Sequence, residues 1–193
     1  MPGAAPNLLL ADEARDLHDF SAPAPGERWV TDITELSVPA GRAYLSAVVD
    51  LFDGRVVGWA AGGRPTAALA ADSLAQALGS LPRGAPAPLV HSDRGMHYRT
   101  GLWLGVCERA GVTRSMSRKG HSPDNAAMEG FFGRLKVEMF RGRDWEGVGV
   151  AELVGRVGDY VSWYNSGRLK RFGDGPTRHE TIDGRRRRLG LTA

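Results

Sequence analysis

The chain of 193 residues lacks paired cysteines, long apolar runs and internal repeats, and each absence excludes a class of protein. Because Cys107 is the single cysteine, neither an intramolecular disulfide nor a cysteine-rich zinc site can form. No run of about 18 apolar residues is present, which excludes a transmembrane helix. The opening stretch MPGAAPNLLLADEARDLHDF lacks the basic and apolar regions of a secretory signal. We therefore expect an intracellular protein in a reducing compartment.

What is present points to a folded domain with an uneven charge. The hydrophobic share of 42% is ample for a globular core, and the length suggests one domain with short appendages. Residues 1–27 carry five acids and one Arg, whereas residues 166–193 carry eight bases and three acids. Residues 109–143 hold eight bases around three acids. Such a zone would suit a polyanionic substrate with a cationic cofactor, and a solvated basic surface would give the same counts.

Hydrophobic periodicity and turn residues predict an α/β order of elements. The expected strands cover 29–35, 42–52, 55–61, 89–92 and 112–117, with Asp53-Gly54 as a hairpin turn. The expected helices cover 67–79, 100–111, a segment from Ser122 to about Met139, and 149–165. Three antiparallel strands extended by parallel crossovers make a mixed five-stranded sheet flanked by helices. We expect an acidic leader over 1–27, a core over 28–166 and a basic tail over 167–193.

Glu129 stands beside an apolar stripe in a helix that we expect to begin with Ser122 as N-cap. The stripe consists of residues at core-facing helical spacing, namely Met128, Phe132, Leu135 and Met139. A solvated boundary position would explain Glu129 taken alone. Its placement is informative only because two aspartates are placed just as oddly.

Asp32 lies in the middle of a predicted strand, where Asp is uncommon, and Asp93 directly follows the apolar strand LVHS. A hydrogen-bonded edge position would explain Asp32, and capping of the following turn would explain Asp93. Together with Glu129, however, they come from three elements that the predicted topology can bring together at the carboxyl ends of the strands. Carboxylates packed close together repel one another, and a divalent cation relieves that repulsion.

The ligand type indicates the chemistry. Oxygen ligands without paired His or Cys suit Mg²⁺ or Mn²⁺. Two such ions, about 3.5–4 Å apart, can activate an attacking hydroxyl or water and stabilise the leaving oxygen. The three acids therefore predict phosphodiester chemistry. His91 and His97 flank Asp93, but a packed and hydrogen-bonded strand histidine is the more ordinary interpretation of His91.

Five stretches carry a resemblance to a known family: WVTDITEL, YLSAVVDLFDGRVVGW, HSDRGMHYR, SMSRKGHSPDNAAMEGFFGRLKVEMF and YVSWYNSGRLK. They resemble the integrase core of bacterial insertion-sequence transposases of the IS-three group, which belong with retroviral integrases among the DDE recombinases. In that family thirty-five residues separate the second Asp from the Glu, and thirty-five residues separate Asp93 from Glu129 here. The resemblance implies an RNase H-like fold, two metal ions held by Asp32, Asp93 and Glu129, and DNA strand cleavage and joining.

The resemblance also implies DNA contacts near the three acids. The family's residue that matches Lys136 contacts DNA, and Lys136 lies seven residues after Glu129 on the same helical face. Weaker DNA-binding candidates lie in neighbouring segments: Arg118, Lys119, Asn125, Arg94 and His97. For Asn125, a hydrogen bond to Glu129 or a phosphate and a cap of the first turn are equally good interpretations. Arg185 to Arg188 form either a phosphate-binding tail or a solvated basic end.

Full transposases of this group carry a helix-turn-helix module before the core, often through fusion to an upstream reading frame. Residues 1–27 do not fit that module, and RFGDGPTRHETIDGRRRRLGL keeps only fragments of the family's C-terminal pattern. We therefore expect a second-frame product or truncated element, acting on DNA in the cytoplasm as a homo-oligomer, nucleoid-associated when bound. An upstream-frame helix-turn-helix protein is the expected partner. The alternatives are an RNase H-like nuclease without strand transfer and an inactive DNA-binding remnant.

Overall fold

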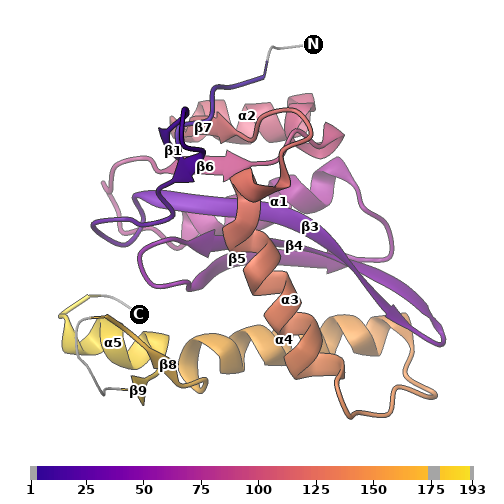
Figure 1. Cartoon of the computed structure of the whole chain (residues 1–193). Helices are drawn as coiled ribbons and strands as arrows, with labels where there is room; N and C mark the ends of the chain where they lie inside the picture. Colours follow the sequence, from indigo (N-terminus) through magenta and orange to yellow (C-terminus); the bar gives the residue numbers. More distant parts are fainter. Residues whose placement is uncertain (1–3, 174–178, 192–193) are drawn as a thin grey trace.

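A mixed five-stranded sheet forms the centre of the computed structural model, which describes residues 4–173 and 179–191 (Figure 1). Its strands in chain order are β3 (Arg28–Val38), β4 (Gly41–Asp50), β5 (Val56–Gly62), β6 (Leu89–Ser92) and β7 (Thr113–Met116). They lie in the order β5-β4-β3-β6-β7; β3, β4 and β5 pair antiparallel, and β6 and β7 run parallel to β3. The hairpin-joined strands and parallel crossovers predicted from the sequence are confirmed.

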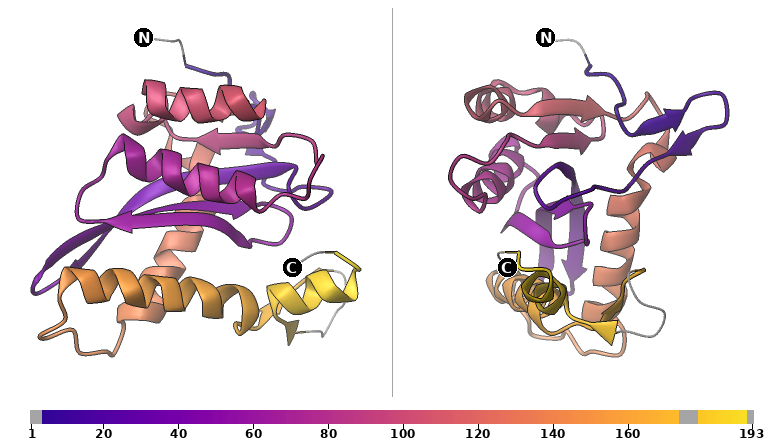
Figure 2. Two further views of the ribbon diagram at one scale, coloured as in Figure 1. Left: turned by 180° about the vertical axis from the view of Figure 1, so that it is seen from behind. Right: turned by 90° about the vertical axis from the view of Figure 1, so that its left-hand side faces the viewer.

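Helices cover both faces of the sheet (Figure 2). The four longest are α1 (Ala67–Gly79), α2 (Gly101–Ala110), α3 (Ala126–Phe140) and α4 (Val150–Ser166). Successive residues of β3 point to opposite faces, so Trp29 packs with α1 and α2, and Val30 packs with α3 and α4. The protein therefore has two apolar clusters, one on each face. Among the described residues, no helix combines the length and the apolar character needed to cross a membrane.

The predicted helix at 67–79 is confirmed, and its contact with the sheet depends on a glycine. The side-chain oxygen of Thr66 caps the helix by accepting a hydrogen bond from the backbone N–H of Leu69 (3.2 Å). A Cβ at Gly58 on β5 would collide with the carbonyl oxygen of Ser73, so only glycine lets α1 lie this close. The Ser73 hydroxyl is also hydrogen-bonded to the Ser46 hydroxyl on β4 (2.8 Å).

The start of α3 differs from the prediction. Ser122 is not its N-cap, because a short 3₁₀ helix, η2 (Ser122–Asn125), comes first and α3 begins at Ala126. Asp124 turns inward within η2, and its carboxylate accepts a hydrogen bond from the backbone N–H of Arg118 (2.6 Å). The predicted apolar stripe is buried along its whole length: Met128, Phe132, Leu135 and Met139.

Residues 4–27 contain structure that the sequence analysis did not predict. β1 (Leu10–Asp12) and β2 (Leu17–His18) form a short antiparallel hairpin, and Leu9 is only 1% exposed within the core. The backbone N–H of Met116 donates to the carbonyl of Pro6 (3.1 Å), which ties the segment to the edge strand β7. Strands of three and two residues are too short to show an alternating pattern. The division at residue 27 remains a prediction.

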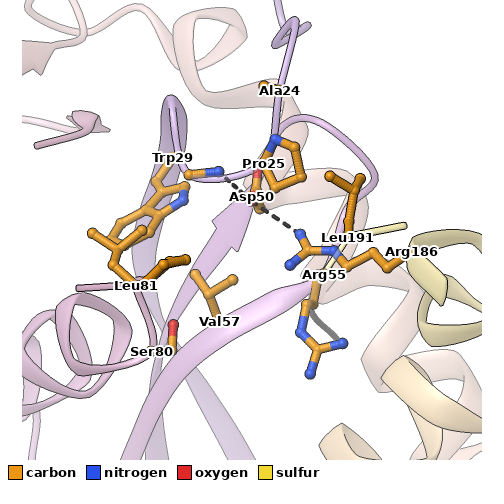
Figure 3. Close-up of a pocket in the computed structure, with 12 residues that line it drawn as sticks. Ala24, Pro25, Trp29, Asp50, Arg55, Val57, Ser80, Leu81, Arg186 and Leu191 are labelled. Carbon is orange, nitrogen blue, oxygen red and sulfur yellow. Dashed lines mark hydrogen bonds and ion pairs between the residues drawn. The ribbon is translucent and has the colours of Figure 1, made fainter. Parts of the chain in front are cut away.

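The basic run near the C-terminus is docked on the core. The elements after α4 are β8 (Lys170–Arg171), β9 (His179–Glu180) and α5 (Ile182–Arg188). Arg186 is only 6% exposed, and its guanidinium donates hydrogen bonds to Asp53 (2.6 Å) and Asp50 (3.1 Å). Figure 3 shows Arg186 beside Asp50 at the edge of a pocket of about 280 Å³. Arg186 therefore fits neither a free phosphate-binding tail nor a solvated end.

The neighbouring aromatic residues Trp163 and Tyr164 of α4 lie in different environments, although the apolar character of both would suit the core. Trp163 is 46% exposed, whereas Tyr164 is buried. On α4, Tyr160 and Tyr164 are four residues apart and both face the core, so the intervening Trp163 turns toward solvent.

Replacing Arg186 with Met should lower the free energy of unfolding by about 3–5 kcal/mol, because Asp50 and Asp53 lose the cation that neutralises them. Arg187→Met is the matched control, since Arg187 is exposed on the same helix and should change stability by less than about 0.5 kcal/mol. Urea denaturation followed by circular dichroism measures both. Equally small effects would mean that the buried pair does not hold α5 in place.

Candidate active site between two strands and a helix

Three acidic side chains from three separate elements line one pocket of about 390 Å³: Asp32, Asp93 and Glu129. Asp32 lies within β3, Asp93 directly follows β6, and Glu129 lies in the first turn of α3. In the parallel pairing of β3 with β6, Thr31 is opposite Ser92. The residue that follows each of these is an aspartate, so the register of the sheet itself brings Asp32 and Asp93 together.

Asp32 is in an unfavourable environment for a negative charge. Burial, followed by the charge of Asp93 and more weakly that of Glu129, raises the pKa of Asp32 to about 7. A hydrogen bond from the backbone N–H of Ile33 (2.8 Å) opposes the shift without cancelling it. The two neighbouring acids are therefore close enough to act on Asp32 electrostatically.

The three carboxylates line the pocket without forming a tight group. Across the described residues, the single set of three acidic or histidine side chains whose ligand atoms all lie within 4.8 Å of one another is Asp16, His18 and Asp124. The acids of the pocket are more widely spaced than that. Oxygen ligands of one Mg²⁺ lie about 2.1 Å from it, which is a tighter arrangement than that of these three acids.

The tighter group of Asp16, His18 and Asp124 already contains a cation. The guanidinium of Arg118 donates to both carboxylate oxygens of Asp124 (2.7 and 3.1 Å) and also pairs with Asp16. Burial of Asp124 opposes its ionisation, but the hydrogen bonds from Arg118 and His18 outweigh burial and hold its pKa well below the ordinary value. The positive charge that a metal would supply comes here from Arg118.

The predicted DNA-binding residues do not form one group. Arg94, Arg118 and Asn125 line the pocket with the three acids. Lys136 is exposed further along α3, where it borders a separate hollow with Phe140. Two further candidates are not among the residues that line the acidic pocket: Lys119, which is exposed, and His97, which is half-buried.

Asn125 links α3 to β3, and its contact with a phosphate remains a prediction. It is 5% exposed and forms no side-chain cap of α3. Its Nδ2 donates to the carbonyl of Thr31 (3.4 Å), which links the start of α3 to the residue before Asp32. Its buried Oδ1 has no hydrogen-bond partner among the described residues. An unsatisfied buried oxygen at the edge of a pocket is available to a donor that enters it.

His91 is a packed strand histidine. Its two ring nitrogens are hydrogen-bonded to the hydroxyls of Ser115 (2.7 Å) and Ser117 (3.2 Å) on the neighbouring segment. Burial lowers its pKa to about 4, so the ring is neutral near pH 7. Asp93, by contrast, combines two roles that the sequence presented as alternatives. It accepts a hydrogen bond from the backbone N–H of Gly95 (2.8 Å) in the following turn, and it also lines the pocket.

Sequence reasoning missed several residues of this pocket, namely Ser117, Gly120, His121 and Ser122. All of them belong to the segment between β7 and α3. The sequence of this segment has no periodicity from which its role could be predicted. Loops at the carboxyl ends of parallel strands contribute to sites because of where the fold places them, which the local sequence does not indicate.

Comparisons with known proteins agree with this geometry. Two family models described as "Integrase core domain" match residues 22–122 and 129–182. The probable transposase for insertion sequence element IS1353 of Shigella flexneri is 48% identical over 86% of this chain and 31% of that protein. The putative transposase InsK for IS150 of Escherichia coli K12 is 38% identical over 86% of this chain and 55% of that protein. An uncharacterized transposase-like protein of Haemophilus influenzae is 36% identical, with 79% of this chain and 68% of that protein covered. The chain thus spans between about a third and two thirds of these relatives.

Solved structures share the fold at low sequence identity. A chain in the structure of the simian T-cell lymphotropic virus intasome in complex with PP2A regulatory subunit B56 gamma superimposes with a TM-score of 0.62 and 16% identity, covering 79% of this chain and 53% of that chain. The HTLV-2 integrase catalytic core domain in complex with magnesium superimposes with a TM-score of 0.54 and 15% identity, covering 77% of this chain and 92% of that chain. Retroviral integrase cores have an RNase H-like fold, and the mixed sheet described above has the same architecture.

The raised pKa of Asp32 predicts a pH-dependent stability in metal-free buffer. A carboxyl group with a folded-state pKa near 7 and an ordinary unfolded pKa stabilises the fold below pH 4 and loses that contribution as pH rises through 7. The loss is at most about 4 kcal/mol. Urea unfolding of Asp32→Asn should therefore become less sensitive to pH between 5 and 8 than unfolding of the unmodified protein. Asp72→Asn, an exposed substitution on α1, should leave the pH response unchanged. Parallel curves for all three proteins would contradict the burial of an ionisable Asp32.

Proposed function

This chain belongs to the integrase core domain family, and from that premise we propose that it catalyses DNA strand cleavage and strand transfer as the catalytic core of an insertion-sequence transposase. One observation carries the proposal: Asp32, Asp93 and Glu129 come from three different elements and line a single pocket, in which burial and the two neighbouring acids raise the pKa of Asp32. A carboxyl group with a strongly perturbed pKa in a cleft is typical of a functional site.

We propose that the three acids hold Mg²⁺ or Mn²⁺. The donor set fits, because all three ligands are carboxylates and His91 is engaged with two serines outside the set. The spacing of the acids favours two ions, with Asp32 shared between Asp93 on one side and Glu129 on the other. When bound, the ions supply positive charge that activates an attacking hydroxyl and stabilises the leaving oxygen. The HTLV-2 integrase catalytic core was solved in complex with magnesium, which supports the choice of metal.

The protein's own residues would hold the DNA beside these acids. Arg94 and Arg118 line the pocket, and exposed Lys136 lies on the same helix as Glu129. Phosphate groups of a DNA strand fit such an arrangement, because each cation neutralises one phosphate without reading the base sequence. Lys119 and His97 are proposed as outer contacts of the same strand.

We further propose that the active form contains more than one copy of this chain and receives its DNA-end specificity from a helix-turn-helix protein encoded upstream. Joining two DNA ends requires two catalytic centres held together. The solved integrase structures with this fold include a dimeric form, a trimeric form and an intasome, which supports an assembly of several copies. The chain spans 31% and 55% of the first two relatives, which leaves room in those proteins for a DNA-end-binding module.

Replacing Asp93 with Asn should reduce strand transfer by at least about 100-fold, because it removes one charged ligand from the proposed site. DNA affinity should stay within about threefold. The assay offers a pre-cleaved donor end with Mn²⁺ and separates joined from hydrolysed products on a denaturing gel. Asp159→Asn, an exposed change on α4, is the control and should be fully active. Hydrolysis without joining would favour the nuclease alternative, and equal loss of binding and joining would give Asp93 a structural role.

Replacing Lys136 with Ala should weaken DNA binding to a similar degree for all sequences. Because one phosphate contact is lost, the slope of log K against log[salt] should fall by about 1. Fluorescence anisotropy at several salt concentrations measures this slope. Arg83→Ala removes an exposed cation from the loop before β6, away from the pocket, and should leave the slope unchanged. Identical slopes for both variants would remove Lys136 from the DNA interface.

A further inference from the structure

The β1–β2 hairpin reaches the segment that borders the candidate active site. Asp124 connects the two. Its Oδ1 accepts hydrogen bonds from Nε2 of His18 on β2 (2.7 Å) and from Nη2 of Arg118 (2.7 Å). Its Oδ2 accepts from the backbone N–H of Arg118 (2.6 Å). With an exposed fraction of 0%, Asp124 is a buried junction whose carboxylate joins the hairpin to the segment from Ser117 to Asn125.

A second, more exposed contact also connects the hairpin to this segment. Asp16, in the turn of the hairpin, pairs with the guanidinium of Arg118 and lies 3.8 Å from Nε2 of His121. His18 is itself held in place, because its ring stacks on Phe20 with 5.4 Å between the centroids. The hairpin therefore contacts Arg118 in two ways. Asp16 pairs with Arg118 directly, and His18 is hydrogen-bonded to Asp124, which in turn binds Arg118.

The segment held in this way lines the candidate active site. Most of its residues border the acidic pocket, among them Ser117, Arg118, His121 and Asn125. Asp124 is not among the lining residues, and it stands five positions before Glu129. Arg118 uses Nε and Nη2 for Asp16 and Asp124, while its Nη1 has no hydrogen-bond partner among the described residues. One edge of the guanidinium is thus fixed and the other remains available to the pocket.

We propose that the β1–β2 hairpin is a strap that positions the segment from Ser117 to Asn125, and that Asp124 is the positioning residue through which it acts. The proposal rests on the proposed function of the acidic pocket. The strap orients Arg118 toward a phosphate in the pocket and fixes the start of α3, which carries Glu129. Asp124 and His18 are positioning residues and touch no substrate. A misplacement of about 1 Å at a reacting group can cost up to about 100-fold in rate, so such a strap would influence turnover strongly.

Asp16→Asn is the most informative variant. Asp16 adopts a positive φ of 54°, a conformation that Asn tolerates well, so the hairpin turn should be retained while the ion pair with Arg118 is weakened. Glu13→Gln is the matched control, because it removes one negative charge from the same exposed turn. Asp124→Asn tests the buried junction, and thermal unfolding shows whether that variant folds.

Strand transfer on a pre-cleaved donor end should show kcat lowered roughly 10-fold by Asp16→Asn and more by Asp124→Asn, with KM for DNA changed less than about threefold. Glu13→Gln should match the unmodified protein. In an Arg118→Ala background, Asp16→Asn should have no further effect, because its target is absent. A general loss of stability would lower activity in both backgrounds.

Hydrogen exchange separates failure of this proposal from failure of the proposed function. Asp16→Asn should speed amide exchange in the segment from 117 to 129, and Glu13→Gln should not, whether or not the protein joins DNA. If the unmodified protein shows no strand transfer while this exchange difference is present, the proposed function fails and the strap stands as a structural device. If Asp16→Asn equals Glu13→Gln in both exchange and kcat, the strap proposal is overturned.

Discussion

The parallel register between β3 and β6 is the constraint on which the candidate site depends. Because Thr31 is opposite Ser92, the following aspartates on the two strands are neighbours at one edge of the pairing. Alternation along β3 puts Asp32 on the same face as Val30, which is the face covered by α3. A slip by one residue would turn Asp32 to the opposite face, toward α1 and α2, and no acid from α3 could then approach it. The sheet register, the side-chain alternation and the position of α3 are therefore required together.

The core elements could be predicted from the sequence because their signals are local. β-branched alternation, the Asp53-Gly54 turn and the cap at Thr66 each act within a few residues, and the structure contains the corresponding strands and helix. The hairpin before β3 and the docked helix α5 could not be predicted in this way. They are held by pairs that are far apart in the chain, such as His18 with Asp124, separated by 106 positions, and Arg186 with Asp50, separated by 136. No sequence window contains both partners.

Those distant pairs also explain the uneven charge of the chain. The sequence predicts an acidic leader over residues 1–27 and a basic tail over residues 167–193. In the structure, Asp16 pairs with Arg118 of the core, and Arg186 pairs with Asp50 of the core. Each terminal segment thus forms an ion pair with an oppositely charged residue of the core. The uneven charge of the chain is therefore related to the way in which its two ends pack on the core. For the same reason charge alone could not identify DNA contacts: Arg118 is largely engaged by acids, whereas Lys136 is exposed.

A cluster of repelling acids does not hold itself together, so its geometry must be imposed by its surroundings. Here the sheet has an apolar cluster on each face, and both clusters include residues of β3. Asp32 therefore belongs to a strand that packs against an apolar cluster on each face, whereas Glu129 belongs to a helix whose first turn is fixed by polar contacts of Asp124 and Asn125. The apolar scaffold supplies the rigidity that tolerates a raised pKa at Asp32, and the polar junction supplies the orientation of the third acid. A functional site is expected to contain groups in unfavourable environments, such as Asp32, within a fold that is otherwise well packed.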